Sequence, residues 1–418
     1  MKAEIIAVGT ELLLGQIVNT NAQYISKQLA EIGIDVYFQT VVGDNRERIQ
    51  EALRMAQQRA DVIVLTGGLG PTEDDLTRDA VAEFTGNTLA FDRAALQQLE
   101  TYFHNRGMAM TENNRRQALF IEGADVLPND AGLAIGSALQ AGNTLYILLP
   151  GPPKELKPMF ERYAKPWLLK HLGQEIRSLH SVMLKFAGIG ESILADRLAD
   201  LIDGQHDPTI APYAQEGEVT IRVSTKASDP AEAERKMRPV LDEIKKRAGE
   251  HLYAETDIPL EQAIVEHFAQ NGWTAAAAES CTGGLISEMI TSVPGSSRVF
   301  AGGIVSYTNE IKHQWLGIPM SELEGQDAHG AVSRETAKLM AEQIRERMNC
   351  RFGVSITGVA GPSPSEGKPV GLVYIGISEQ GKQTQVFEER FNGDRVLIRW
   401  RAAKRALYLL WKSSKNME

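Results

Sequence analysis

Residues 61–77 read DVIVLTGGLGPTEDDLT, a short apolar run followed at once by a glycine-rich, acidic turn. The run at 61–66 has the length and the β-branched residues of a buried strand. Strands and helices alternate around it, with strands expected at 5–8, 34–42, 132–139 and 144–149 and helices at 22–32 and 45–56. Because the first strands begin about 30 residues apart, the spacing of βαβ units, this region predicts a three-layer α/β/α domain with a mostly parallel sheet.

Two further regions follow, each with its own pattern. The middle region has a helix-like stretch at 190–203, an alternating strand at 218–226 and a charged helix after Pro230, which together predict a small α+β module. The last region predicts an α/β layered domain, with strands at 273–279, 301–307, 352–357, 371–378 and 384–391 and helices at 260–268, after Gly284, at 333–347 and from 394. We therefore expect three domains, at 1–172, 173–252 and 257–414.

Composition narrows the functional class. The 418 residues are 43% hydrophobic and 23% charged, which is ordinary for globular domains, and the formal net charge is −10. Such a chain lacks the excess of Lys and Arg that a general nucleic-acid binder needs. Its two cysteines, Cys281 and Cys350, argue against a disulfide framework or a Cys-based zinc site. No apolar run approaches the ~20 residues that span a bilayer, and the start lacks a signal-peptide pattern, so we expect a cytoplasmic protein without membrane contact.

Three loops of the first domain directly follow expected strands: Gly9–Glu11, Gly43–Asp44 and Gly67–Thr77. In an open parallel sheet, such loops meet at the carboxyl edge, where ligands bind. Glycines let backbone N–H groups approach a phosphate, and carboxylates suit a hard divalent cation. The expected ligand contacts are Gly9, Glu11, Gly67, Gly68, Gly70 and Thr77, and the expected metal ligands are Asp44, Asp74 and Asp75. Alternatively, these glycines form tight turns and these aspartates cap helices.

A second candidate site lies in the last domain, where Glu279–Gly284 (ESCTGG) stands between a strand and a helix. Ser280 is a candidate nucleophile there, beside N–H groups at the helix start that can stabilise an oxyanion. A serine needs a base, and the histidines form no recognisable triad pattern. Lys312 offers an alternative, because a lysine buried in a pocket loses its proton near neutral pH, and Tyr307 can relay that proton.

Each of these residues also has a structural explanation. Ser280 fits a helix N-cap, Lys312 fits a solvated helix lysine, and Tyr307 fits a half-buried strand residue. Cys281 is a rival nucleophile, although such a residue more commonly fills a small space in a core. A third loop, Thr357–Pro362, follows a strand and can approach a ligand through its backbone. Spacing alone leaves this site as a suggestion.

The motifs of the first domain resemble known families. The segment GGLGPTEDD (67–75), with Thr77 two residues after Asp75, is similar to the molybdopterin-binding fold of the MoaB and MogA type. Together with GTELLLGQIVNTNA (9–22), it resembles the CinA (competence/damage-inducible protein A) family more specifically. The CinA resemblance implies a pyrophosphatase acting on ADP-ribose with a divalent metal such as Mg, Mn or Co. The molybdopterin resemblance implies instead that Asp44 and Asp75 serve pterin chemistry.

The motifs of the last domain resemble the CinA C-terminal domain, the nicotinamide mononucleotide deamidases. They are AESCTGG (278–284), GGIVSYTNEIK (302–312), SITGVAGP (355–362) and GKPVG (367–371). The resemblance implies that Ser280 is the nucleophile, that Tyr307 and Lys312 form its activating pair, and that no cofactor is needed. The expected substrate-binding residues are Thr282, Gly283, Gly284, Asn309, Thr357, Gly358, Ala360 and Gly361, with Arg399 or Arg401 of the last helix expected at the substrate phosphate.

Three functional hypotheses follow for the whole chain. The first is a homodimeric enzyme of pyridine-nucleotide salvage, with an amidohydrolase at the C-terminus and a metal-assisted pyrophosphatase at the N-terminus. In the second, the N-terminal domain only binds a nucleotide or pterin as a regulator or scaffold. The third is an interaction protein in DNA uptake or repair, for which the acidic charge is unfavourable. The middle module resembles a KH-type insert, but its acidic character does not favour RNA binding.

Overall fold

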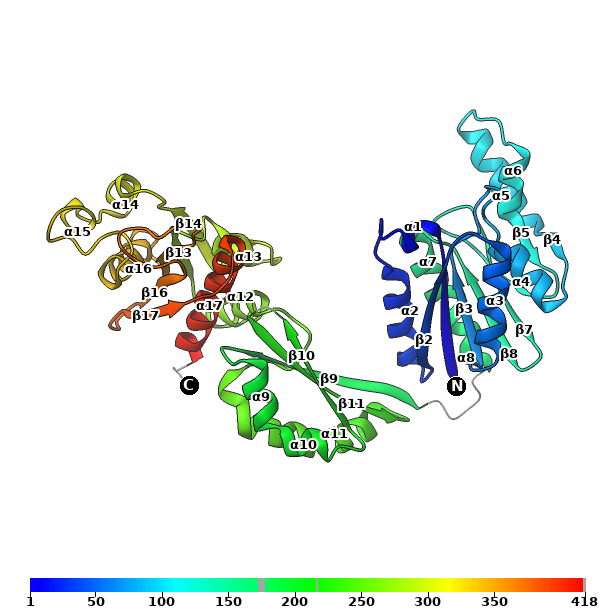
Figure 1. Ribbon diagram of the computed structural model, residues 1–418, viewed down its shortest axis with the longest axis horizontal. Coiled ribbons are helices and arrows are strands. Elements are labelled where there is room, and N and C mark those ends of the chain that lie inside the picture. Colours follow the sequence, from blue (N-terminus) through cyan, green and yellow to red (C-terminus); the bar gives the residue numbers. More distant parts are fainter. Residues whose placement is uncertain (172–176, 216, 416–418) are drawn as a thin grey trace. The chain divides into compact units, whose positions relative to one another are not determined.

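The computed structural model describes residues 1–171, 177–215 and 217–415. The chain forms two compact units, and Figure 1 draws both. One comprises Met1–His180 with Thr225–Lys236, and the other comprises Ser181–Ser224 with the residues from Met237 onward.

The first unit is built on a six-stranded sheet with the order β2-β1-β3-β8-β7-β6. Its strands are β1 (Lys2–Val8), β2 (Asp35–Val42), β3 (Val62–Thr66), β6 (Asp125–Leu127), β7 (Gly136–Ala141) and β8 (Thr144–Leu149). Strands β1, β2, β3 and β8 pair in parallel, whereas β7 pairs antiparallel with both of its neighbours, β8 and β6. The mostly parallel sheet is therefore confirmed. The strand expected at 132–139 begins only at Gly136, since the preceding residues form a loop tied by Asn129 to Ala131 and Ala134.

Helices cover both faces of this sheet, which confirms the three-layer arrangement. On one face, Ile5, Val64 and Ile147 pack against α2 (Thr20–Glu31), α7 (Pro153–Met159) and α8 (Lys165–His171). On the other face, Ile6, Leu65 and Leu148 pack against α3 (Arg46–Gln57) and α4 (Thr77–Thr85). Neighbouring residues of one strand thus point to opposite cores, as the period of a β-strand requires. The remaining elements are β4 (Leu89–Phe91), β5 (Leu119–Ile121), α1 (Thr10–Leu13), α5 (Arg93–Asn105) and α6 (Glu112–Arg115).

The middle of the chain contains a four-stranded sheet with the order β10-β11-β9-β12. Its strands are β9 (Ser178–Ala187), β10 (Thr209–Gln215), β11 (Glu218–Ala227) and β12 (Leu252–Ala254), and its helices are α9 (Glu191–Arg197), α10 (Ala199–Asp203) and α11 (Pro230–Ala248). The single helix expected at 190–203 is divided at Leu198, whose φ of −111° and ψ of 7° are not helical. The mixture of strands and helices agrees with the expected α+β module.

The last part of the chain is a second three-layer structure, around a five-stranded sheet with the order β14-β13-β15-β16-β17. Its strands are β13 (Ala275–Glu279), β14 (Phe300–Val305), β15 (Phe352–Gly358), β16 (Leu372–Glu379) and β17 (Gln385–Arg390). One face packs against α12 (Leu260–Asn271), α13 (Leu285–Thr291) and α17 (Arg395–Lys415), and the other against α14 (Asn309–Leu316), α15 (Met320–Leu323) and α16 (Arg334–Arg347). The predicted α/β layering is confirmed.

The parallel strands of this last sheet determine where its functional loops meet. Strand β13 pairs in parallel with both β14 and β15, so the three strands end at the same edge. The segments that follow them begin at Ser280, Ser306 and Val359. Loops far apart in the sequence are therefore brought together there. Over the described parts of the chain, no helix has both the length and the apolar character needed to cross a membrane.

Candidate functional site

Ser280 and Lys312 are in direct contact at this edge of the C-terminal sheet. The Nζ atom of Lys312, on α14, donates a hydrogen bond to Ser280 Oγ over 3.1 Å and a second one to the Ser306 carbonyl over 2.8 Å. Only 8% of Ser280 and 1% of Lys312 are exposed. The ammonium group is therefore held at the serine hydroxyl in a largely water-free position.

Burial also changes the protonation of this lysine. It lowers the pKa of Lys312 from 10.5 to about 8, because the charged ammonium form loses its solvation. The nearby Cys281 and Glu366 oppose this shift. A substantial share of Lys312 is therefore neutral slightly above neutral pH, and a neutral amine accepts a proton from a serine hydroxyl.

The carboxylate of Glu279 occupies the start of helix α13. Its two oxygens accept hydrogen bonds from the backbone N–H groups of Gly284, Ile286 and Ser287 and from the Ser287 hydroxyl, at 2.8–3.1 Å. Glu279 is fully buried and has lost its contact with water. These donors and the positive end of the helix stabilise its charge instead. This differs from the sequence prediction, in which N–H groups at the helix start stabilise an oxyanion. Those groups are already used to fix the loop that carries Ser280.

Tyr307 lines the same cavity but does not form the expected activating pair with Lys312. Its hydroxyl accepts a hydrogen bond over 2.9 Å from Arg395, the first residue of α17, and 56% of the residue is exposed. Within the described residues, no hydrogen bond joins Tyr307 to Ser280 or Lys312. The other end of the Arg395 guanidinium donates to the Gly361 carbonyl. Tyr307 thus orients an arginine at the cavity, rather than the base.

Arg399 holds the loop that carries Ser280 (residues 280–284, called the serine loop) by hydrogen bonds to its backbone. Its Nε and Nη2 atoms donate to the carbonyls of Cys281 and Thr282, over 3.1 and 2.6 Å. It does not line the cavity, and neither do Thr282, Gly283 and Gly284. The prediction that Arg399 meets a substrate phosphate is therefore not supported, because its donors are directed at the loop backbone. Arg401, the other predicted candidate, lines a different pocket.

The cavity around Ser280 has a volume of about 290 Å³. The predicted residues Asn309, Thr357, Gly358, Ala360 and Gly361 all line it. The Thr357 hydroxyl is directed away from a ligand, since it donates to the Ala331 carbonyl over 2.7 Å, and the Asn309 side chain donates to Glu324. A cavity of this size accommodates a small polar molecule next to the Ser280 hydroxyl.

Cys281 is adjacent to the cavity but is a poor nucleophile. Burial raises the pKa of its thiol to about 12, and only 6% of the residue is exposed. Because the thiolate is the reactive form, a thiol with such a pKa is inert at neutral pH. Ser280 is the better candidate.

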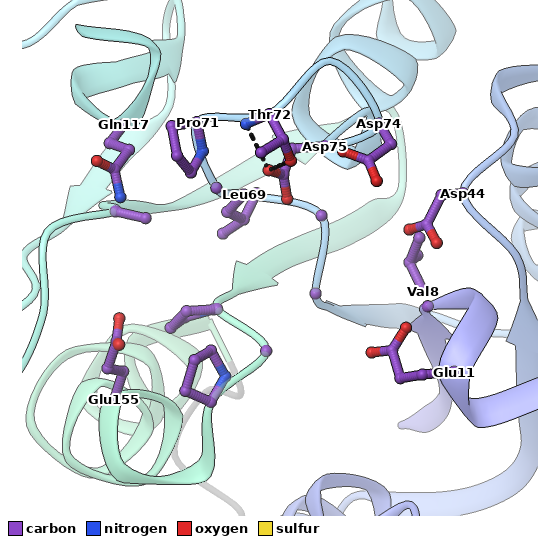
Figure 2. A pocket seen from close by; sticks show the side chains of 18 residues that line it. Val8, Glu11, Asp44, Leu69, Pro71, Thr72, Asp74, Asp75, Gln117 and Glu155 are labelled. Atoms are coloured by element: carbon purple, nitrogen blue, oxygen red, sulfur yellow. Dashed lines mark hydrogen bonds between the residues drawn. The ribbon is translucent and has the colours of Figure 1, made fainter. Parts of the chain in front are cut away.

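The N-terminal loops form a second pocket, of about 400 Å³, at the carboxyl ends of β1, β3 and β8. Figure 2 shows Glu11, Asp44 and Asp74 on one side of this pocket and Gln117 and Glu155 on the other. The predicted Gly9, Gly67, Gly68, Gly70 and Asp75 also line it. The three loops that begin at Gly9, Gly43 and Gly67 are thus brought to one place, as the alternation of strands and helices predicts.

The loop after β3 requires a glycine at one position, and at another a side chain would displace Asp75. Gly67 has a φ of +91°, and a Cβ atom there would lie 2.3 Å from the Val8 carbonyl oxygen. At Gly70, a Cβ atom would lie 2.4 Å from Asp75 Oδ2. Thr77 differs from the prediction, because it is fully buried beneath Gly68 and does not line the pocket. It supports the loop instead of contacting a ligand.

The acidic groups of this pocket do not form a complete metal cage. Asp44 accepts from the backbone and hydroxyl of Thr10, and Asp75 accepts from the backbone and hydroxyl of Thr72. Among the described residues, no three His, Cys, Asp or Glu side chains are grouped so that they alone could hold a metal ion. The prediction of Asp44, Asp74 and Asp75 as a shared ligand set therefore needs oxygen atoms from another source.

Several residues that the structure brings to the two sites could not be predicted from the sequence. They are Glu279, Glu366 and Arg395 in the C-terminal domain and Gln117 and Glu155 in the N-terminal domain. Arg395 had a usable signal, because Asp394 caps the helix by accepting from Leu397 N, which places Arg395 in the first turn. Glu279 ends strand β13 inside the motif AESCTGG, but that motif does not indicate its role at the helix start, and the other three have no periodic signal.

Three sequence profiles match the chain. A profile described as probable molybdopterin binding domain matches residues 4–170, one described as damage-inducible protein CinA KH domain matches 181–254, and one described as CinA C-terminal domain matches 257–414. Together they cover nearly all of the chain.

Whole-length relatives are also found. A putative competence-damage inducible protein of Geobacillus kaustophilus is 50% identical over 410 residues, which is 98% of each chain. A CinA-like protein of Dictyoglomus thermophilum is 47% identical over the full length of both. Among solved structures, the protein CinA of Thermoplasma acidophilum, described as having unknown function, is 34% identical, covers 40% of this chain and 96% of its own, and has a TM-score of 0.37.

Proposed function

Because the chain belongs to the CinA family of competence/damage-inducible proteins, we propose that its C-terminal domain hydrolyses the carboxamide of nicotinamide mononucleotide. The products are nicotinic acid mononucleotide and ammonia. The observation that carries the proposal is the buried contact of 3.1 Å between Lys312 Nζ and Ser280 Oγ. It supplies a nucleophile together with a base whose pKa, about 8, suits proton transfer near neutral pH.

The reaction is acyl transfer in two steps. Ser280 Oγ bonds to the carboxamide carbon while neutral Lys312 takes the hydroxyl proton. The C–N bond then breaks, and Lys312 returns that proton to the leaving nitrogen, which departs as ammonia. Water next attacks the acyl carbon and gives a proton to neutral Lys312, which passes a proton to Oγ as the bond to Oγ breaks, so that the acid is released and the serine is restored. The Ser306 carbonyl keeps the Lys312 amine directed at the serine throughout.

Arg395 is the proposed contact for the substrate phosphate. Its guanidinium borders the cavity, and Tyr307 and the Gly361 carbonyl hold it in one orientation. A planar guanidinium forms strong, oriented hydrogen bonds with phosphate oxygens. We assign this role to Arg395 in place of Arg399, because Arg395 lines the cavity and Arg399 does not.

The test is ammonia release from nicotinamide mononucleotide by the purified chain, measured in the presence of a chelator. Wild type is expected to release ammonia, and the variant Ser280→Ala is expected to release none. Absence of release from folded wild-type protein would overturn the proposal. Release that persists in Ser280→Ala would leave the substrate standing and overturn the serine mechanism.

For the N-terminal domain we propose a metal-dependent pyrophosphatase acting on ADP-ribose. The pocket lining contains five carboxylates, from Glu11, Asp44, Asp74, Asp75 and Glu155, and the described lining contains no Lys or Arg. A diphosphate is repelled by such a lining unless a cation neutralises it. A Mg²⁺ ion is commonly bound by one or two carboxylates plus phosphate oxygens, which fits a lining without a three-residue cage. Bound there, the ion would neutralise the diphosphate and polarise its phosphorus–oxygen bonds.

The chain's own residues position this substrate. The loop after β3 brings backbone N–H groups close to the pocket, and Asp44 and Asp74 provide carboxylates at one side of it. Cleavage of ADP-ribose to AMP and ribose 5-phosphate, with and without added Mg²⁺, Mn²⁺ or Co²⁺, tests the proposal. Cleavage that needs no metal would overturn the metal dependence, and binding without cleavage would favour a purely regulatory nucleotide site.

A further inference from the structure

We propose that Glu366 is a specificity-determining residue that selects a substrate with a positively charged ring. The inference rests on the proposed deamidase function and adds the feature by which the site recognises its substrate. Glu366 borders the same 290 Å³ cavity as Ser280, Lys312 and Arg395, and it is the one carboxylate in the described lining. A carboxylate repels the phosphate of a phosphorylated substrate. Its presence in the cavity is therefore favourable only if another part of the substrate is positively charged.

The Glu366 side chain is held in place from several directions. Its Oε2 atom accepts a hydrogen bond from Val332 N over 3.2 Å and lies 3.5 Å from Lys368 Nζ. The residue itself has a φ of +53°, which non-glycine residues adopt only rarely. A Cβ atom at Gly330 would lie 2.6 Å from Oε2, so the glycine leaves the space that the carboxylate occupies. These contacts fix the carboxylate at the wall of the cavity.

One oxygen of this carboxylate remains available. Across residues 1–171, 177–215 and 217–415, no hydrogen bond is made to Glu366 Oε1. Lys368 neutralises the charge only in part, because its Nζ atom also donates to the His329 and Val332 carbonyls. The remaining negative charge acts on the reacting end of the cavity, where it raises the pKa of Lys312 against the effect of burial.

The charges of the cavity match those of a pyridinium mononucleotide. The ring nitrogen that bears the ribose is positively charged, and the phosphate at the other end is negative. A substrate whose carboxamide is placed at Ser280 shares the cavity with Glu366, which we assign to the ring, and with Arg395, which we assign to the phosphate, since all three residues line it. A neutral ring has no such electrostatic attraction to the Glu366 carboxylate. The product carries a new carboxylate beside it, which Glu366 repels and so helps to release.

The experiment compares two substrates in wild type and in Glu366→Gln. One is nicotinamide mononucleotide, and the other is its analogue with a neutral benzamide ring in place of the pyridinium. A glutamine keeps an acceptor for Val332 N and removes only the charge. We expect kcat/KM to fall about tenfold for the charged substrate and less than about threefold for the neutral one. Measurement at pH 9, above the Lys312 pKa of about 8, keeps the base mostly neutral in both proteins.

Two further variants complete the design. Glu366→Asp retains the charge and is expected to retain most of the preference for the charged substrate. Glu346→Gln, which removes a surface carboxylate on α16 of the same domain, is expected to leave the ratio of the two substrates unchanged. Inhibition by nicotinic acid mononucleotide is expected to be several times tighter in Glu366→Gln than in wild type.

The outcomes separate this inference from the proposed function. If wild type hydrolyses neither substrate, the deamidase proposal fails. If wild type is active but Glu366→Gln reduces kcat/KM for both substrates by the same factor, or for neither, the deamidase proposal stands and the role of Glu366 is overturned.

Discussion

The Lys312 amine is 3.1 Å from the hydroxyl of Ser280, a residue 32 positions earlier in the chain, and both groups are buried. The contact arises because β13 and β14 are parallel neighbours that end at the same edge of the sheet. Ser280 follows the first strand directly, and Lys312 is in the second turn of the helix after the other. Two features of this contact, the identity of the nucleophile and the pKa of the base, can be tested separately.

Removal of the Ser280 hydroxyl and removal of the neighbouring Cys281 thiol are expected to have very different effects on activity. The variant Ser280→Ala loses activity by about a thousandfold or more, because the group that forms the acyl bond is gone. Cys281→Ala keeps activity within about threefold, since burial raises the thiol pKa to about 12 and the thiolate is absent at neutral pH. Ammonia release by the two purified variants checks both expectations. If the Cys281→Ala protein were folded but inactive, the nucleophile would be the Cys281 thiol and not the Ser280 hydroxyl.

The activity is expected to rise with pH as Lys312 loses its proton. The pKa of Lys312 is lowered to about 8, chiefly by burial and against the opposing charge of Glu366. Only about one molecule in ten has a neutral Lys312 at pH 7, and about nine in ten have it at pH 9. The pH profile of kcat/KM should therefore show its acid limb near pH 8.

Lys312→Met removes this base without adding a charge. The variant is expected to lose most of the activity at every pH, and circular dichroism should report an unchanged fold. A residual activity whose profile still has its acid limb near pH 8 would show that another group titrates there.

Much of the fold could be predicted from the sequence. Apolar runs such as 61–66 and 144–149 became buried strands, because strands covered on both faces must be apolar along their whole length. The edge strand β6, which pairs antiparallel with β7, has only the three residues Asp125–Leu127, too few for a recognisable alternation, and its place in the sheet was not predicted. Short edge strands depend on tertiary packing more than on local pattern.

The residues of the candidate site could be predicted where loops follow strands, as at Ser280. On the last helix, the sequence does not show which arginine reaches the cavity. Arg395 and Arg399 are four positions apart, so they lie on the same face of α17, one turn from each other. The sequence indicates that face, but which arginine reaches the cavity depends on where the helix begins relative to the serine loop. Glu366 has no periodic signal, because its position follows from the loop that carries it.

Arg395 and Arg399 are therefore expected to affect different kinetic constants. Arg395→Ala should raise KM for nicotinamide mononucleotide by about 10- to 100-fold, the value of a charged hydrogen bond to phosphate. It should have little effect on nicotinamide riboside, which lacks the phosphate. Arg399→Ala should instead lower kcat, because it releases the Cys281 and Thr282 carbonyls that hold the serine loop. Steady-state kinetics with both substrates distinguish the two, and a KM effect confined to Arg399→Ala would reverse the assignment.

Substitution of Glu279 is expected to lower the free energy of unfolding more than substitution of an exposed residue on the helix that follows it. Glu279→Gln replaces one carboxylate oxygen by an amide NH₂ that faces the N–H groups of α13, leaving at least one of four hydrogen bonds unmade. The free energy of unfolding should fall by about 2 kcal/mol. Glu288→Gln, at an exposed position on the same helix, should change it by less than about 0.5 kcal/mol. Urea unfolding of the two variants measures the difference, and equal midpoints would contradict the capping role.

In the N-terminal pocket, a metal ion and a diphosphate are expected to bind together. Since the described lining has several carboxylates and no basic side chain, a nucleoside diphosphate alone should barely raise the melting temperature. Mg²⁺ alone should also have a small effect, because no three-residue cage exists in the described chain. Added together, the two should raise the melting temperature by several degrees more than the sum of their separate effects. Asp44→Asn should abolish this excess, whereas Glu73→Gln should preserve it, because Glu73 is exposed and, although it belongs to the loop after β3, does not line the pocket. Strong stabilisation by the diphosphate in chelator would mean that backbone N–H groups alone neutralise it, and the metal would then have no place in the site.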